Sequence, residues 1–360
     1  MARQNRKTLL LSAALLSLLL ALITQPAAAY LAAQNGLRLW WQVVAPALLP
    51  FFIINELLLE LGVSVLAGRA FRRLMQPLFA LPGAAALPVL MGFCSGFPTG
   101  AAIVARLRQQ NALSRDAAER AVAFTNNAGP LYLTVGVAVG LLHMPGAAAA
   151  LCVAHYGADL LLGLLLGALA RRRGPDCRRE APPEAATLFP VAPWGQLLKT
   201  AAGRALRNIL LIGAYMTFFA AATALPARLL PDERPLLRAL LLGLCEMSLG
   251  LQALTECGLP PAMLLPAAAA MISFGGFSVQ SQVLAMLADS DIRPRRYLLA
   301  RPLQAALAFQ IALPLTRRVS HTAAGFAFVP GPRPPLLLYS VLLALLSALP
   351  LLMLLRRGHC

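Results

Sequence analysis

Two glutamates, Glu56 and Glu246, lie inside apolar stretches of the chain. An ionised side chain at membrane depth costs about 3 kcal/mol or more and normally faces a cavity or a partner. Each glutamate is followed three residues later by a leucine, Leu59 or Leu249, and 190 positions separate the two (246 − 56). We interpret them as equivalent positions of a duplicated unit that handle substrate, ions or protons. The alternative is a structural contact with a broken helix.

Two arginines, Arg120 and Arg301, are separated by a similar 181 positions (301 − 120). A guanidinium group binds a carboxylate through two parallel hydrogen bonds, so this pair suits an anionic substrate. Arg301 lies beside Pro302 in an apolar stretch, and we expect it to face the substrate. Arg120 is a further candidate, with a position at the membrane interface as the alternative.

Residues 91–100 interrupt the apolar run 87–107 with three glycines, a proline, a serine and a threonine. Inside a helix, glycine costs about 1 kcal/mol and proline about 3 kcal/mol. Broken backbone at membrane depth is tolerated only where protein or a water-filled cavity satisfies its polar groups. The segment therefore predicts an interrupted helix that lines a site.

Residues 273–282 form a second such segment in the apolar run 262–287, and Gly96-Phe97 aligns with Gly276-Phe277 at an offset of 180 (276 − 96). Paired interruptions of this kind point to a transporter binding site. Half-helix N-termini suit anions, although small hydroxyl residues also permit close helix packing. The candidate substrate-binding residues at the two breaks are Ser95, Thr99, Ser278, Gln280 and Gln282.

Asn126 and Asn127 precede Gly129-Pro130 in a helix that begins after Ser114. Proline removes a backbone hydrogen bond, so this helix is predicted to break or kink. We interpret both asparagines as substrate-facing, with capping of the broken helix as the alternative. Farther along, His155 and Asp159 are one helical turn apart, which favours a structural pair over a proton relay.

The composition is that of an integral membrane protein whose partner is the lipid bilayer. Hydrophobic residues make up 59% of the 360 residues and charged residues 12%, against about 45–50% and about 25% in soluble domains. The net charge of +17 fits basic loops beside membrane spans. There is no groove-reading motif, so nucleic acid is not an expected partner.

Enzyme motifs are absent from the sequence, including HExxH, the P-loop and G-x-S-x-G. The six cysteines show no CxxC or paired spacing, so neither a disulfide framework nor a metal site is predicted. We therefore expect no catalytic residues, no cofactor and no metal.

The chain is predicted to be all-α and polytopic, with two repeated halves of five apolar segments each. We assign residues 1–36 to a retained first span, with a cleaved signal peptide as the alternative. Residues 37–170 and 204–356 form the two repeats. The linker 171–203 between them is basic and proline-rich, and its end belongs to an interfacial segment, 194–207. Whether the repeats are inverted, which segments are re-entrant and whether the protein is a homo-oligomer remain open.

Several motifs resemble the sporulation integral membrane protein YlbJ (SpoVV) family. In the first half these are residues 46–52, 91–101 and 124–130, and in the second half residues 243–250 and 273–283. The resemblance covers about residues 37–315. Ser248 and Gln280 depart from the Thr and His that the family favours there, which changes substrate detail more than family membership.

The resemblance implies two nucleoside-recognition Gate domains and a distant likeness to concentrative nucleoside transporters, in which glutamate-bearing hairpins and broken helices form the site. It also implies a role in endospore formation, namely transport of dipicolinic acid across the outer forespore membrane. A small aromatic dianion of this kind matches the arginines and helix N-termini described above. The alternatives are a carrier of nucleosides or other small metabolites, and a non-transporting membrane scaffold of spore maturation.

Overall fold

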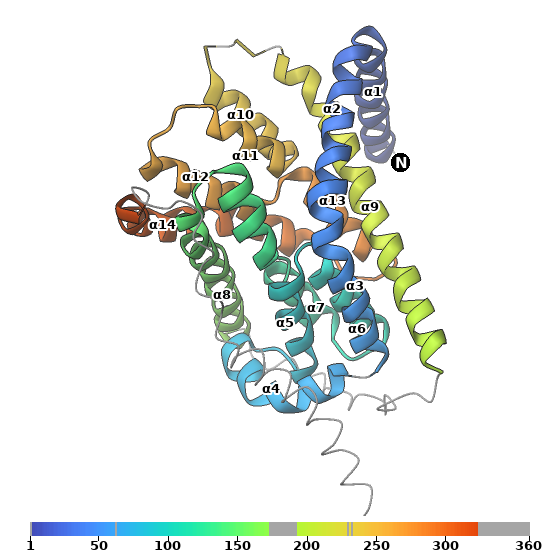
Figure 1. Cartoon of the computed structure of the whole chain (residues 1–360). Coiled ribbons are helices and arrows are strands. Elements are labelled where there is room, and N and C mark those ends of the chain that lie inside the picture. The colour runs from blue at the N-terminus through green and yellow to red at the C-terminus, as the bar shows by residue number, and fades with distance from the viewer. Residues whose placement is uncertain (1, 62, 173–192, 229, 232, 323–360) are drawn as a thin grey trace, which may run out of the picture. The chain divides into compact units, whose positions relative to one another are not determined.

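The computed structural model describes residues 2–61, 63–172, 193–228, 230–231 and 233–322, and every regular element in these ranges is a helix (Figure 1). The all-α prediction is therefore confirmed. Up to residue 172 the α-helices are α1 (Ala2–Thr24), α2 (Pro26–Leu39), α3 (Ala45–Glu60), α4 (Val63–Phe79), α5 (Ala86–Ser95), α6 (Thr99–Gln109), α7 (Arg115–Phe124) and α8 (Ala148–Arg172). From residue 194 they are α9 (Trp194–Arg228), α10 (Pro235–Cys245), α11 (Met247–Thr255), α12 (Pro261–Phe274), α13 (Gly276–Leu287) and α14 (Arg295–Thr322).

Membrane-spanning length is reached by four helical stretches within the described ranges, and by up to six if two bent pairs are each counted as one span. The four stretches are Pro145–Arg172, Trp194–Ala224, Pro261–Leu287 and Arg295–Thr316. The protein is therefore an integral membrane protein. The described structure has fewer uninterrupted spans than the ten predicted apolar segments, because bends and breaks divide several of them. The last predicted segment, residues 336–355 of the second repeat, lies outside the described residues.

The apolar stretch 236–254, which contains Glu246, is not one continuous helix. It forms two helices, α10 and α11, whose interruption is Glu246 in an extended conformation (φ −141°, ψ 114°). A Cβ atom on Gly250 would lie 2.1 Å from the Cα atom of Gly243, so the two helices fold back on each other. With 11 and 9 residues, neither approaches the roughly 20 residues that a crossing needs. The pair is a helical hairpin with Glu246 at its tip.

The long helix α9 supports the N-terminal helices, and α1, α2 and α9 lie alongside one another (Figure 1). Gly36 of α2 brings its backbone against Met216 and Ala220 of α9, and Trp40 donates a hydrogen bond to the Ile209 carbonyl at 3.0 Å. The predicted first span, 1–36, contains α1 and most of α2, which bend by 105°. The predicted boundary at 203/204 falls inside α9, which is continuous from Trp194.

The two helices that follow the glycine breaks, α6 and α13, pack against each other. Near them, Gln109 donates to the Asp289 carbonyl at 3.2 Å, and Arg296 pairs with Asp116 at 2.6 Å. Both contacts join positions 180 apart (289 − 109 and 296 − 116), which is the offset of the two glycine motifs. The division into two similar halves stays a prediction.

Candidate functional site

The first predicted break lies between α5 and α6. Gly96 has φ +92°, the left-handed region that favours glycine, and the Phe97–Pro98 peptide is cis. A Cβ atom on Gly96 would lie 3.0 Å from the Gly129 backbone nitrogen, so this break contacts a second interruption, residues 125–130, between α7 and the π-helix η3 (Tyr132–Leu141). Both predicted interruptions of the first half are confirmed, and they touch.

The third interruption is the predicted break between α12 and α13, where Gly275 and Gly276 have φ +80° and +69°. A Cβ atom on Gly275 would lie 3.9 Å from the Phe97 ring, and one on Gly276 would lie 3.0 Å from the Gly243 carbonyl oxygen and 3.2 Å from the Met247 nitrogen. The second glycine break therefore contacts both the first glycine break and the hairpin tip. Four helix interruptions therefore meet in one region, which we call the break cluster. They lie at residues 96–98, 125–130, 246 and 275–276.

His155 of α8 ties two parts of the break cluster together. Its Nε2 accepts a hydrogen bond from the Ala128 backbone N–H at 2.9 Å, and its Nδ1 lies 2.8 Å from the Ser273 hydroxyl. Because Nε2 is an acceptor, the ring is neutral and the Nδ1–H donates to Ser273. The predicted pairing of His155 with Asp159 is not formed, since backbone and hydroxyl partners brought by other elements occupy both ring nitrogens.

The two asparagines of the 125–130 interruption have different surroundings. Asn126 Oδ1 accepts from the Ala101 N–H at 2.8 Å and its Nδ2 donates to the Val122 carbonyl at 2.8 Å, so this side chain caps the start of α6. The geometry thus favours the capping alternative for Asn126 over the substrate-facing one. Asn127 is also fully buried, and its Oδ1 has no hydrogen-bond partner in the described part of the chain.

Arg301 of α14 is fully buried beside the same interruption. It donates to the carbonyl oxygens of Ala123 at 2.6 Å and Asn126 at 3.1 Å, where a cation complements the C-terminal end of α7. Its guanidinium carbon lies 4.8 Å from the centre of the Tyr297 ring. Arg301 therefore connects α14 to the main chain of α7 and of the 125–130 interruption.

Arg120 lies at a different place from Arg301. It donates to the Ala80 carbonyl and pairs with Asp116, one turn earlier on α7. The expectation that the two arginines form one anion-binding pair is therefore wrong, because the fold sends their side chains to opposite ends of α7.

The two predicted glutamates also have unlike positions. Glu246 is 2% exposed at the hairpin tip, and its Oε2 accepts a hydrogen bond from the Leu249 N–H at 2.8 Å, which caps α11. Glu56 lies within the uninterrupted α3 and pairs with Arg106 at 2.9 Å and Arg204 at 3.4 Å. Only Glu246 belongs to the break cluster.

The remaining predicted residues are buried at the two glycine breaks. Ser95 accepts a hydrogen bond from Asn55 at 2.7 Å, while the Thr99 hydroxyl has no hydrogen-bond partner within the described ranges. On α13, Gln280 is 3.4 Å from the Phe274 carbonyl and Gln282 is 3.5 Å from the Ser278 hydroxyl.

Several polar residues of this region were not predicted from the sequence. The Tyr132 hydroxyl lies 2.9 Å from the Ser248 hydroxyl, which joins η3 to the hairpin. Gln304 is fully buried on α14, one turn beyond Arg301. The available signal for Gln304 was an amide inside an apolar run, whereas nothing local distinguishes Tyr132 from a core residue.

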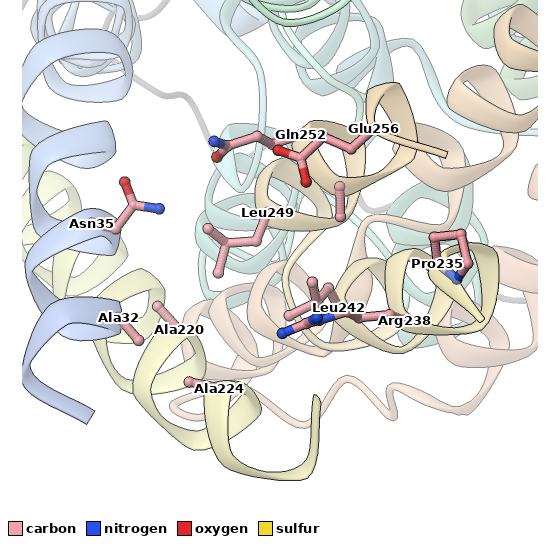
Figure 2. Close-up of a pocket in the computed structure, with 11 residues that line it drawn as sticks. Ala32, Asn35, Ala220, Ala224, Pro235, Arg238, Leu242, Leu249, Gln252 and Glu256 are labelled. Carbon is pink, nitrogen blue, oxygen red and sulfur yellow. The ribbon is translucent and has the colours of Figure 1, made fainter. Parts of the chain in front are cut away.

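A pocket of about 470 Å³ lies between α2, α9, α10 and α11, and in Figure 2 the amides of Asn35 and Gln252 point toward one another across it. Leu242 and Leu249, which flank Glu246 in the chain, are among its apolar lining residues. The polar lining residues, none of them predicted, are Asn35, Arg238, Gln252 and Glu256. The pocket therefore borders the hairpin outside the break cluster.

Comparison with known proteins agrees with this architecture. The family model described as Gate, nucleoside recognition, matches residues 41–144, which contain the first two interruptions. The sporulation integral membrane protein YlbJ of Bacillus subtilis (strain 168) is 32% identical over 331 residues, 84% of this chain and 81% of the relative. No solved structure matches significantly. The chain belongs to the family of the sporulation integral membrane protein YlbJ.

Proposed function

We propose that this protein transports a small anionic metabolite, and that the metabolite is dipicolinic acid moved across the outer forespore membrane during endospore formation. The carrier has no catalytic activity in this proposal. The observation that carries it is the break cluster, since helix interruptions inside an apolar bundle are where transporters bind their substrates. The family's place in sporulation supports the cellular setting.

The N-terminus of α13 supports the choice of an anion. Among the described residues no side chain caps this helix, whereas Asn126 caps α6. A helix N-terminus carries roughly half a positive charge and presents backbone N–H groups. Ser278, the third residue of α13, is buried there. One carboxylate of the substrate binds at this end of α13.

The second carboxylate binds at Thr99, the first residue of α6, whose buried hydroxyl has no hydrogen-bond partner in the described part of the chain. The two helix starts lie close together, since α6 packs against α13 and a Cβ atom added to Gly275 would lie 3.9 Å from the Phe97 ring. Glu246 does not oppose the anion strongly, since the N–H group of Leu249 at the start of α11 compensates its charge.

Uptake of labelled dipicolinate into proteoliposomes tests the proposal. The parent protein should accumulate the label and bind dipicolinate in calorimetry. Ser278→Ala and Thr99→Val should each weaken binding by roughly ten- to a hundredfold, as expected for the loss of one hydrogen bond to a charged group. Glu233→Gln, which changes an exposed residue outside the break cluster, is the matched control and should bind like the parent.

The match to the nucleoside-recognition family favours a nucleoside carrier as the second candidate. Competition separates the two, because excess uridine should leave dipicolinate binding unchanged if the site is built for a dianion. Displacement by uridine would reverse the order of the candidates. Failure of well-folded protein to take up either compound would favour a membrane scaffold of spore maturation.

A further inference from the structure

We infer that Asp159 is a proton-binding site that couples proton movement to transport, an inference that rests on the proposed function. Asp159 lies within the candidate span Pro145–Arg172 and is fully buried. Neither carboxylate oxygen makes a hydrogen bond of good geometry within the described residues. Buried polar groups are almost always hydrogen-bonded, so the group needs a specific explanation.

The surroundings of Asp159 define that explanation. From α14 it faces Arg301, whose Nη2 is 3.9 Å from Oδ1, together with Tyr297 and the amide of Gln304. From α8 itself the titratable neighbours are Tyr156 and His155, and the hydrogen bonds of His155 make that ring neutral. Arg301 is the one cation in this set, and it is committed to other acceptors.

Those acceptors are the carbonyl oxygens of Ala123 and Asn126, at 2.6 and 3.1 Å from the guanidinium nitrogens. The contact with Asp159 at 3.9 Å is about 1 Å longer than a charge-assisted hydrogen bond. In this conformation Arg301 attracts an ionised Asp159 across 3.9 Å but donates no hydrogen bond to it, so the cost of burying the carboxylate is only partly offset. A proton on the carboxyl group removes the charge instead and lets Asp159 remain buried.

Loss of that proton changes the balance at Arg301. An ionised Asp159 competes with the two carbonyl oxygens, and a displacement of about 1 Å forms a direct ion pair. The released carbonyls belong to the last turn of α7 and to the interruption whose Asn126 side chain caps α6. The protonation state of Asp159 thus selects between two arrangements of the break cluster, as a local charge change does in other switches.

Infrared spectroscopy tests the proton site without reference to transport. The parent at neutral pH should show the carbonyl stretch of a protonated carboxyl group, and the difference spectrum against Asp159→Asn should contain that band. Glu246→Gln is the comparison for the other buried acid and should leave the Asp159 band in place. A parent spectrum in which Asp159→Asn removes no such band would overturn the inference.

Transport tests the coupling. With one proton per substrate, accumulation of dipicolinate by the parent should rise about tenfold for each pH unit of gradient. Asp159→Asn should let the substrate equilibrate across the membrane without responding to the gradient. A pH-sensitive dye should report proton movement during transport by the parent but not by Asp159→Asn. Uptake by the parent that ignores the gradient would overturn the coupling but leave the proposed function standing, whereas absence of any uptake would contradict the proposed function.

If Asp159→Asn does not fold, the dye measurement on the parent still tests whether protons accompany the substrate. Proton entry that accompanies dipicolinate supports the coupling, and dipicolinate entry without protons contradicts it. Asp289→Asn, which changes an exposed acid in the loop after α13, should leave both signals unchanged.

Discussion

Glu56 and Glu246 occupy matching positions in the two halves of the sequence but have different structural roles in the fold. Glu56 lies in an unbroken helix and is fixed by two arginines, one of them Arg204 on α9. Glu246 interrupts its helix and binds backbone N–H groups at a hairpin tip. The comparison indicates that Glu56 anchors α3 to α9, whereas Glu246 forms one of the interruptions of the break cluster.

The two glycine breaks differ in a similar way. Gly92 and Gly100 of the first break press directly on the Thr125 carbonyl, where an added Cβ atom would lie 1.9 Å from the oxygen. At the second break, Gly276 leaves 3.0–3.2 Å to its neighbours. The first break is closely packed against the chain, and the second has slightly more room.

The largest effect should come from Gly100→Ala, which forces a methyl group into the Thr125 carbonyl. A clash with backbone cannot be relieved by a rotamer change, so we expect a loss of about 4 kcal/mol or failure to fold. Gly276→Ala should cost about 1–3 kcal/mol, because its φ of +69° is strained for alanine. Thermal unfolding in detergent measures both.

Gly203→Ala on α9 is the control, because a Cβ atom there would meet nothing within 4 Å. Alanine favours a helix interior over glycine by about 0.5–1 kcal/mol, so this variant should be slightly more stable than the parent. If Gly100→Ala melted together with Gly203→Ala, the close packing of the first break would be refuted.

A smaller effect on stability should separate the two glutamates. Glu56→Ala leaves Arg106 and Arg204 sharing Glu60 and should cost about 1–3 kcal/mol, given that the cluster is only partly exposed. Glu246→Ala removes one helix cap and should cost about 1 kcal/mol. Dipicolinate uptake per folded molecule should follow the opposite order, with the greater loss in Glu246→Ala. Equal losses of uptake would contradict the distinction between Glu56 as an anchoring residue and Glu246 as a residue of the site.

The sequence was sufficient for the features that depend on local backbone chemistry. Glycine and proline at residues 91–100, 125–130 and 273–282 predicted three of the four interruptions. The fourth, at Glu246, has no adjacent glycine or proline, because the glutamate side chain itself caps the new helix. The spacing of Gly243 and Gly250 was the missed signal, since both are needed where the two arms of the hairpin touch.

The site was predictable in composition but not in its contacts. Asn126 and Arg301 were expected to face a substrate, yet they bind main-chain groups of α6 and α7 that only the tertiary fold brings to them. The same holds for His155, whose partners are Ala128 and Ser273 instead of its neighbour Asp159. Spacing along one helix identifies residues on a shared face but not what packs against that face.

The smallest effect should appear where the halves meet outside the membrane spans, at Arg108 and Asp291. The Arg108 guanidinium donates hydrogen bonds to the Asp291 carboxyl at 2.8 and 3.0 Å and holds its pKa below the ordinary value. The stabilisation is therefore present above the unfolded-state pKa of about 3.9 and is lost as the pH falls through the lower folded-state pKa. Because the Asp291 side chain is 47% exposed, Asp291→Asn should cost only about 0.5 kcal/mol at neutral pH.

Salt distinguishes this exposed pair from the partly buried Glu56 cluster. Raising the ionic strength shortens the screening length from about 10 Å at 0.1 M to about 3 Å at 1 M, which weakens exposed pairs most. The stability difference between Asp291→Asn and the parent should therefore shrink in 1 M salt, while that between Glu56→Ala and the parent should largely persist. Equal salt sensitivity of the two differences would mean that Glu56 is as solvated as Asp291. It would contradict the interpretation that Glu56 anchors α3 to α9.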